Sequence, residues 1–367
     1  MHLRTSLSRA MTTATTTRRP EAPFAAAVQE LAAFLRDGGS KIAVITGAGI
    51  STDSGIPDYR GENGTYTLNP EYKPVFYQPF VTSDEARRRY WARSFLGFPP
   101  VMTTEPNPSH YALAALQSPL LFEPPTIPAS PAVGEHYKPE DEKNRGFIST
   151  LITQNVDGLH QKAGAKDTIE LHGTLHQIKC MKCGHEQDRS DFQQELAGLN
   201  LEWDSVLKSQ TITSLYSRMN ADGDVELRTP DDQQQQQDHL GQQKKVNALD
   251  YRKFVYPTCS CCGSGQYKPS VVFFGENIPV HSKEATNQAI LESNGLLVIG
   301  TSFSTHSAFR LVKLAKDAGV PIAMVNLGQT RADPLVDYRY DMGCTQLLTA
   351  VAQELEISEV PGIIKRK

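Results

Sequence analysis

One stretch, residues 42–61, constrains the fold of this 367-residue chain more than any other. It opens with the apolar, largely β-branched run 42–46, which is typical of a strand buried on both faces of a parallel sheet. Gly47, Ala48 and Gly49 follow directly. Glycine lets the backbone approach a ligand closely, and free N–H groups in such a turn can bind a phosphate. We therefore expect a dinucleotide pyrophosphate site at this turn.

The glycine spacing departs from the common dinucleotide-binding pattern. Gly55 follows Gly47 and Gly49 after a longer gap than G-x-G-x-x-G requires, and a simple tight turn would also explain the first two glycines. Residues 56–61 contain Pro57, which disfavours a helix interior, together with an aspartate, a tyrosine and an arginine. We interpret this segment as a loop that covers the ligand; the alternative is a charged loop in solvent.

Composition narrows the class of protein. The chain is 39% hydrophobic and 21% charged, which is ordinary for a soluble protein. Its net charge of −4 gives no reason to expect nucleic acid as a partner. No apolar run approaches the roughly 20 residues that a membrane span needs, so we expect no membrane insertion.

The first 20 residues differ from the rest of the chain. They contain four arginines and many serines and threonines, and no acidic residue precedes Glu21. This composition is typical of a mitochondrial transit peptide, so we predict a leader over residues 1–20 and import into the mitochondrial matrix. The alternative is a disordered tail whose composition arose by chance.

Strand-like and helix-like segments alternate along the remaining chain. Such alternation predicts an α/β fold, a Rossmann-like doubly wound parallel sheet with helices on both faces. The strand-like segments are residues 42–46, 147–153, 270–274, 296–299 and 321–325, and the helix-like segments are residues 24–36, 83–95, 107–117, 282–291, 307–318 and 346–355.

Two C-x-x-C pairs, Cys180 with Cys183 and Cys259 with Cys262, are the strongest signal that comes from the residues alone. Four thiolates would close a tetrahedral Zn²⁺ shell, so we predict one structural zinc ion. Cys261 competes with Cys262 as a ligand, but the two-residue spacer favours Cys262. The alternatives are disulfides, which a matrix or cytosolic compartment disfavours, or a redox pair, which needs only one such motif.

These signals predict two folded units with insertions. The Rossmann-like dinucleotide-binding domain would comprise residues 21–174 and 263–357, and a zinc-binding module would be inserted between its two parts. The predicted segments outside this core are the module itself (175–262), a Pro-rich surface loop (118–145), a low-complexity, disordered insertion (204–250) with a glutamine run (233–237), and a C-terminal tail (358–367).

Small or polar residues follow four of the strand-like segments. Because ligands bind at the carboxyl ends of the strands in open α/β sheets, four such turns indicate one elongated polar ligand, such as a dinucleotide. His172 is a candidate general base, although a lone histidine is more often structural. The four turns are Gly47-Ala48-Gly49, Gln154-Asn155-Val156-Asp157, Gly300-Thr301-Ser302 and Asn326-Leu327-Gly328.

Taken in order, these motifs resemble the sirtuin family over roughly residues 28–355. The amino-acid sequences of segments 58–60, 89–93 and 106–108 resemble those of the class II, mitochondrial sirtuin-four type. The matching motifs are residues 47–51, 55–60, 153–157 and 171–173, the two C-x-x-C pairs, and residues 271–276, which resemble the substrate-side motif.

The resemblance implies an NAD-dependent protein-lysine deacylase, with acylated-lysine proteins as substrates in a cleft between the Rossmann-like domain and the zinc module. The acyl oxygen would attack the NAD ribose and release nicotinamide. His172 would then activate a ribose hydroxyl, and water would release lysine and O-acyl-ADP-ribose. Asn155 and Asp157 would line the nicotinamide pocket. The implied NAD contacts are Gly47, Ala48, Gly49, Ser51, Gly55, Ile56, Pro57, Asp58, Tyr59, Arg60, Gln154, Asn155, Val156, Asp157, Gly300, Thr301, Ser302, Asn326, Leu327, Gly328 and Cys344.

Tyr90 and Arg93 have the spacing with which class II desuccinylases surround an acidic acyl group. The three-residue spacing puts both on one helix face, and an arginine can hold an acyl carboxylate. The alternative, of equal weight, is a solvated arginine in an arginine-rich helix.

Three other functions are compatible with parts of the sequence. They are a protein mono-ADP-ribosyltransferase or lipoamidase on the same scaffold, a weakly catalytic NAD-binding scaffold protein, and a hydride-transferring dehydrogenase. Intact Asn155, Asp157 and His172 argue against the scaffold protein, and the glycine pattern argues against the dehydrogenase.

Overall fold

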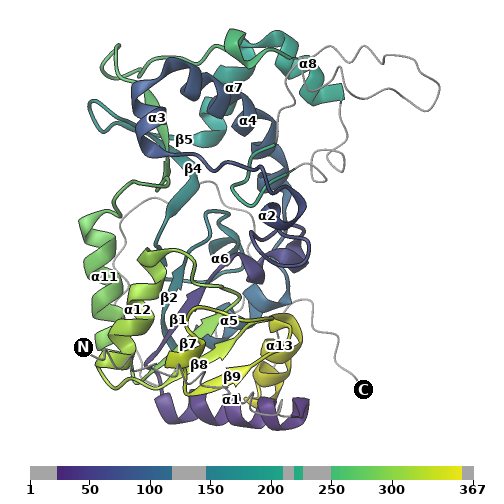
Figure 1. Ribbon diagram of the computed structural model, residues 1–367, viewed down its shortest axis with the longest axis vertical. Coiled ribbons are helices and arrows are strands. Elements are labelled where there is room, and N and C mark those ends of the chain that lie inside the picture. Colours follow the sequence, from purple (N-terminus) through teal and green to yellow (C-terminus); the bar gives the residue numbers. More distant parts are fainter. Residues whose placement is uncertain (1–22, 118–145, 210–218, 226–248, 358–367) are drawn as a thin grey trace, which may run out of the picture.

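The computed structural model describes residues 23–117, 146–209, 219–225 and 249–357. The predicted leader, the loop 118–145, the glutamine run and the tail 358–367 lie outside the described residues. Two regions stack along the long axis in Figure 1, with a large sheet and its helices below and a smaller sheet with further helices above.

A six-stranded parallel sheet forms the lower region. The strand order is β3-β2-β1-β7-β8-β9, and every neighbouring pair is parallel. Successive strands are therefore added outward on one side of β1 as far as β3, and then on the other side of β1 from β7 to β9. All residues of β1, β7 and β8 are buried, as the apolar runs predict for strands covered on both faces. The predicted Rossmann-like doubly wound sheet is therefore confirmed. The strands are β1 (Ile42–Thr46), β2 (Ile148–Thr153), β3 (Thr168–Glu170), β7 (Gly295–Ile299), β8 (Ile322–Val325) and β9 (Tyr338–Tyr340).

Helices cover both faces of this sheet. One face packs against α1 (Phe24–Gly38), α5 (Pro108–Gln117) and α13 (Cys344–Glu354), which share a core with Val44 and Leu297. The other face packs against α11 (Val280–Leu291) and α12 (His306–Asp317). Figure 1 shows these two helices together on one side of the sheet and α13 on the other. Within the described residues, no helix is both long enough and apolar enough to cross a membrane.

A three-stranded antiparallel sheet, in the order β5-β4-β6, lies in the upper region. Its strands are β4 (Gly173–Cys180), β5 (Glu186–Asp188) and β6 (Tyr267–Val271). The prediction that residues 270–274 form a strand in the βα alternation was wrong, because β6 ends at Val271 and pairs with β4. The β-branched and aromatic residues of this run suit any pleated surface, so the local sequence cannot choose between the two sheets.

Helices α3 (Tyr77–Thr82), α4 (Asp84–Thr103), α7 (Arg189–Leu199) and α8 (Leu201–Ser209) complete the upper region. Ser83 caps α4 as predicted, since its Oγ accepts the Ala86 N–H at 3.2 Å. The helix runs beyond the predicted end and through Pro99 and Pro100. Pro99 has no N–H for the Phe95 carbonyl, and the Gln193 side chain donates to that carbonyl instead, at 2.9 Å.

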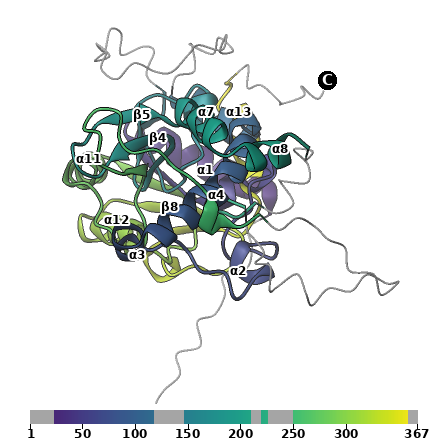
Figure 2. The ribbon, with the colours of Figure 1, turned by 90° about the horizontal axis from the view of Figure 1, so that it is seen from above.

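Part of the predicted low-complexity insertion is folded. Its first residues belong to α8, and residues 219–225 form a hairpin in which Met219 pairs antiparallel with Val225. Gly223 has a φ of +69° at the turn. The prediction of disorder was wrong for these two segments, while residues 210–218 and 226–248 lie outside the described residues. Viewed from above in Figure 2, α2 (Thr65–Leu68) and α8 lie at the periphery.

Candidate functional site

The turns after β1 and β7 pack directly against each other. Gly49 donates its N–H to the Gly300 carbonyl at 2.9 Å. A Cβ on Gly49 would lie 2.9 Å from that carbonyl oxygen, and a Cβ on Gly47 would lie 2.6 Å from Thr301 Cβ. Gly300 itself has a φ of +61°. Glycine is therefore required here for close packing between two strand ends, at the point where the order of the sheet reverses.

Ser51, Asn155 and Asp157 meet beside these glycines. Ser51 Oγ donates to Asp157 Oδ2 at 2.7 Å, and Asn155 Nδ2 lies 3.1 Å from Ser51 Oγ and 3.2 Å from the Gly47 carbonyl. Asp157 is only 8% exposed, and burial raises the pKa of its carboxyl group. The structure therefore brings together three of the predicted site residues, from the ends of β1 and β2.

His172 follows β3 and lies beside the end of β2. Its Nδ1 is 3.0 Å from the Gln154 carbonyl, and its Nε2 is 2.8 Å from Ser307 Oγ. Because a carbonyl oxygen only accepts, Nδ1 carries the proton, and Nε2 accepts from the serine hydroxyl. Burial lowers the pKa of His172 to about 4. The ring is therefore neutral near pH 7, with a lone pair on Nε2, as a general base requires.

The Gln154 side chain connects the end of β2 with the turn after β7 and the loop that follows it. Its Nε2 donates to Thr301 Oγ1 at 2.9 Å, and its Oε1 accepts from Thr305 Oγ1 at 3.4 Å. The same residue accepts from His172 through its main chain. Gln154 thus fixes the position of His172 relative to the turn after β7.

The polar segment after the glycines, residues 55–60, is called the cover segment below. Ile56 is buried, and Asp58 accepts the Gly61 N–H at 2.8 Å within the loop. Arg60 Nη1 donates to Ser304 Oγ at 2.6 Å, which links the cover segment to the loop between β7 and α12. The cover segment therefore spans the carboxyl edge of the sheet from β1 to β7.

The turn after β8 is more open. Asn326 Nδ2 donates to the Leu327 carbonyl at 2.7 Å, Gly328 N–H donates to Asp341 Oδ1 at 2.9 Å, and Leu327 is 70% exposed. Cys344, at the start of α13, is partly buried, and its Sγ is 3.9 Å from the Gly49 carbonyl. Cys344 thus lies beside the turn after β1. The polar groups of residues 326–328 form hydrogen bonds with one another and with Asp341.

Sequence reasoning missed Ser304, Thr305 and Ser307. All three lie within eight residues of Gly300, in the loop between β7 and α12 or in the first turn of that helix. The one signal for them in the sequence is that they follow the Gly300-Thr301-Ser302 turn within a few residues. Their contacts with His172, Gln154 and Arg60 depend on the tertiary structure.

Tyr90 and Arg93 are both buried, at 6% and 3% exposure. Arg93 Nη2 lies 2.9 Å from Asp224 Oδ1, and Tyr90 packs edge-on against Phe80 and Phe273. The interpretation as a solvated arginine was therefore wrong. The guanidinium already faces a carboxylate of this chain, contributed by the hairpin in the insertion.

The four predicted zinc ligands, Cys180, Cys183, Cys259 and Cys262, form one cluster whose sulfur atoms all lie within 4.8 Å of one another. Two of the separations, Cys180 to Cys262 and Cys183 to Cys259, are 3.8 and 3.7 Å. A tetrahedral ZnS₄ site with bonds of about 2.3 Å has edges of about 3.8 Å, whereas a disulfide is about 2.05 Å long. The arrangement fits a metal ion, and Cys261 is exposed and outside the cluster.

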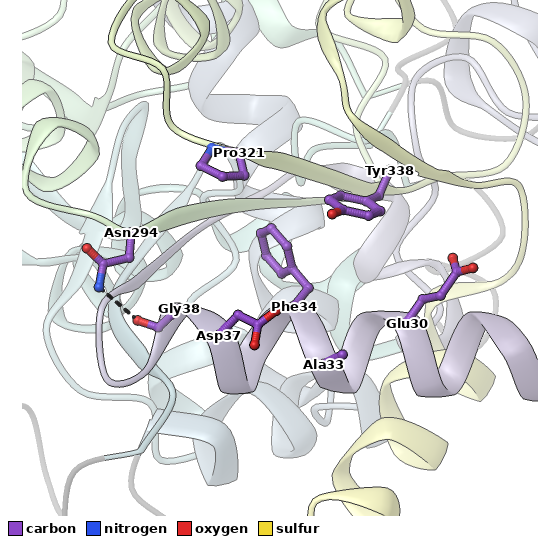
Figure 3. Close-up of a pocket in the computed structure, with 8 residues that line it drawn as sticks. All are labelled: Glu30, Ala33, Phe34, Asp37, Gly38, Asn294, Pro321 and Tyr338. Carbon is purple, nitrogen blue, oxygen red and sulfur yellow. Dashed lines mark hydrogen bonds between the residues drawn. The ribbon is translucent and has the colours of Figure 1, made fainter.

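A surface pocket lies at the opposite end of the large sheet (Figure 3). Asn294 Nδ2 donates to the Gly38 carbonyl at 3.1 Å, and the Phe34 ring points between Pro321 and Tyr338. These residues precede or begin strands, so the pocket is at the amino edge, away from the polar cluster around His172. Its lining residues are Glu30, Ala33, Phe34, Asp37, Gly38, Asn294, Pro321 and Tyr338.

Comparison with known proteins agrees with this arrangement. The Sir2 family model matches residues 47–122 and 135–307. The "NAD-dependent protein deacylase SIR4" of Batrachochytrium dendrobatidis is 39% identical over 332 residues, which cover 89% of this chain and 93% of that protein. The Drosophila melanogaster "NAD-dependent protein deacylase Sirt4" is 34% identical, covering 84% and 81%.

A solved structure described as "Sir2-p53 peptide-NAD+" superposes with a TM-score of 0.59 at 26% identity, covering 90% of this chain and 99% of that chain. The chain belongs to the Sir2 family.

Proposed function

We propose that this protein is an NAD-dependent protein-lysine deacylase in which His172 is the general base. The observation that carries the proposal is the position of the buried His172 ring at the carboxyl edge of the sheet, where its Nδ1 lies 3.0 Å from the Gln154 carbonyl and its Nε2 faces Ser307 Oγ at 2.8 Å. The relatives named above support the choice of NAD and of an acylated protein as substrates.

The residues at the sheet edge fit NAD. Gly47 and Gly49 let the turn after β1 pack closely against Gly300 and Thr301, so a pyrophosphate at this edge would lie beside the main chain of both turns; the Gly47 and Gly49 N–H groups themselves donate to the Ile299 and Gly300 carbonyls. Ser51, Asn155 and Asp157 would bind the nicotinamide end, and residues 55–60 would cover it. NAD supplies the electrophilic ribose carbon that accepts the acyl oxygen.

His172 would act after nicotinamide has left. Its Nε2 would take the proton of a ribose hydroxyl while Nδ1 stays hydrogen-bonded to Gln154, so that the positive charge on the ring faces a carbonyl oxygen. Phe273, which packs against Tyr90, would help to keep water away from the acyl group.

The zinc ion has a structural role in this proposal. Cys180, Cys183, Cys259 and Cys262 would supply all four ligands, so no position is left for a substrate. The ion would join β4 to the chain that leads into β6, which places residues 271–276 beside His172.

The proposal is tested by incubating the full chain with NAD and a panel of acyl-lysine peptides, followed by mass spectrometry. We expect bare lysine and O-acyl-ADP-ribose to appear together, and His172→Ala to lose at least about a hundredfold in rate, as is usual for a general base. His281→Ala, an exposed histidine on α11, is the matched control and should keep full activity.

Two results would contradict the proposal. ADP-ribose left on protein, with free nicotinamide and no deacylated peptide, would indicate a mono-ADP-ribosyltransferase. Most of the activity surviving in His172→Ala would remove the assigned base.

We also propose that the protein acts in the mitochondrial matrix. The support is the arginine-rich leader of residues 1–20, which has no acidic residue. A fluorescent reporter fused behind residues 1–30 should enter mitochondria, and the same fusion with its arginines changed to glutamate should stay outside. Cytosolic fluorescence of the unmodified fusion would contradict this localisation.

A further inference from the structure

The hairpin of residues 219–225 places one carboxylate, that of Asp222, between two tyrosine hydroxyls. Tyr59 of the cover segment donates to Asp222 Oδ1 at 2.6 Å, and Tyr72 donates to Oδ2. Burial and the nearby Asp222 raise the pKa of Tyr59 well above its ordinary value, so its hydroxyl stays protonated and remains a donor. Both oxygens of Asp222 are thus used by residues that follow β1.

Two adjacent residues of the cover segment hold two different parts of the molecule. Tyr59 reaches up to the hairpin, while Arg60 reaches across to Ser304 in the loop between β7 and α12. The Tyr66 ring is next to both side chains, with its centroid 5.1 Å from the Arg60 guanidinium carbon and 5.9 Å from the centroid of the Tyr59 ring. Because the two residues are consecutive, fixing Tyr59 restricts where Arg60 can lie.

The hairpin is itself firmly attached to α4. Asp224 pairs with Arg93, and its Oδ1 also accepts from Asn220 Nδ2 at 2.9 Å. Gly97 on α4 has no room for a side chain, since a Cβ there would lie 2.5 Å from Asp224 Cα. The Ala221 N–H donates to Thr65 Oγ1 at 3.0 Å. The hairpin therefore has a defined position from which Asp222 can hold the cover segment.

We propose that Asp222 is a positioning residue that holds the cover segment, through Tyr59, in the conformation that binds NAD. The inference rests on the proposed function only in taking NAD as the ligand of the sheet edge. Asp222 touches no reacting atom in this proposal. Its effect reaches the ligand through Tyr59 and then Arg60, so the insertion sets the affinity of the NAD site.

The test is the affinity of the full-length, zinc-loaded protein for NAD, measured by titration calorimetry without any acyl peptide. Asp222→Ala and Tyr59→Phe should each raise the Kd by about fivefold, the size of one hydrogen bond. The double variant should bind NAD no more weakly than Asp222→Ala alone, because Asp222→Ala already breaks the contact with Tyr59, along with the one to Tyr72. Asp222→Asn, which keeps one acceptor oxygen, should recover part of the affinity.

Tyr251→Phe is the matched control. It removes another tyrosine hydroxyl that donates to a carboxylate, Glu85 Oε1 at 3.1 Å, and neither residue belongs to the cover segment or to the hairpin. NAD affinity should not change in this variant. In steady-state assays, Asp222→Ala should raise the KM for NAD and leave kcat within about twofold, as expected when only binding is affected.

Two results with these variants would overturn the proposal. One is an unchanged Kd for NAD in Asp222→Ala, whatever happens to its melting temperature. The other is additive effects of Asp222→Ala and Tyr59→Phe. If the wild-type protein binds NAD but turns over no acyl peptide, the deacylase proposal fails while the calorimetry still decides the role of Asp222. A wild-type protein that does not bind NAD overturns both.

Discussion

The carboxyl edge of the large sheet and the upper region differ in how their contacting residues are distributed along the sequence. At the sheet edge, most of the site residues lie in the turns directly after the strands, as Gly47 and Asn155 do. In the upper region, neighbours in space are far apart in sequence, as Arg93 and Asp224 or Cys180 and Cys262 are. The register of the parallel strands places the site residues together at the sheet edge. The upper region instead depends on the cysteine ligands of a metal ion, on ion pairs and on inserted segments.

The difference predicts where the molecule is vulnerable. Substitutions at the sheet edge should reduce ligand binding and leave the fold intact, because the hydrophobic core beneath is extensive. Substitutions in the upper region should reduce stability first, because its contacts include buried charges and a metal cluster that are costly to leave unpaired.

The largest effect is expected from Cys180→Ser. Binding of structural zinc is worth on the order of 10 kcal/mol, so loss of one ligand should release the ion and unfold the upper region. Zinc content, measured by atomic absorption, should fall to background. Cys261→Ser, an exposed cysteine outside the cluster, should keep its zinc. A soluble, metal-free and fully active Cys180→Ser protein would contradict the structural zinc site.

Arg93→Ala should have the next largest effect. It leaves Asp224 buried without its cation, which destabilises by about 3–5 kcal/mol for a buried pair. Urea unfolding followed by circular dichroism measures this. Lys208→Ala, which breaks an exposed pair with Asp204, should cost less than about 1 kcal/mol. Equal costs for the two variants would mean that the upper region does not depend on its buried pair.

Gly49→Ala should weaken NAD binding with a smaller change in stability. The added Cβ would lie 2.9 Å from the Gly300 carbonyl oxygen, and overpacking of this kind costs about 1–3 kcal/mol. Calorimetry with NAD and thermal melting together separate the two effects. Gly198→Ala, on α7 with no atom within 4 Å of its Cβ, is the control. Unchanged affinity for NAD in Gly49→Ala would exclude this turn from the site.

The smallest effect is a displacement of the acidic limb of the pH–rate profile. Burial lowers the pKa of His172 from 6.5 to about 4, and the base acts only when Nε2 is unprotonated. Activity should therefore persist below pH 6.5 and fall as the pH drops through about 4. A profile of kcat/KM against pH measures this. An acidic limb at 6.5 would mean that His172 is solvated in the working enzyme.

Much of the sheet could be predicted from the sequence because its signals are local. Apolar runs bounded by glycines and polar residues identify β1, β2, β7 and β8, and the same boundaries mark the turns that carry Gly47, Asn155 and Gly300. The run at residues 270–274 failed for the same reason, since a local pattern shows that a segment is extended and not which strand it pairs with.

The sequence by itself determined the parallel sheet, the four cysteines of the metal cluster and the residues at the strand ends, since strand periodicity and C-x-x-C spacing act over a few residues. Only the tertiary structure decided that Arg93 faces Asp224, that Ser307 meets His172, and that Asp222 holds Tyr59. Those contacts join segments more than 100 residues apart, and no periodicity in a chain encodes which distant segments pack together.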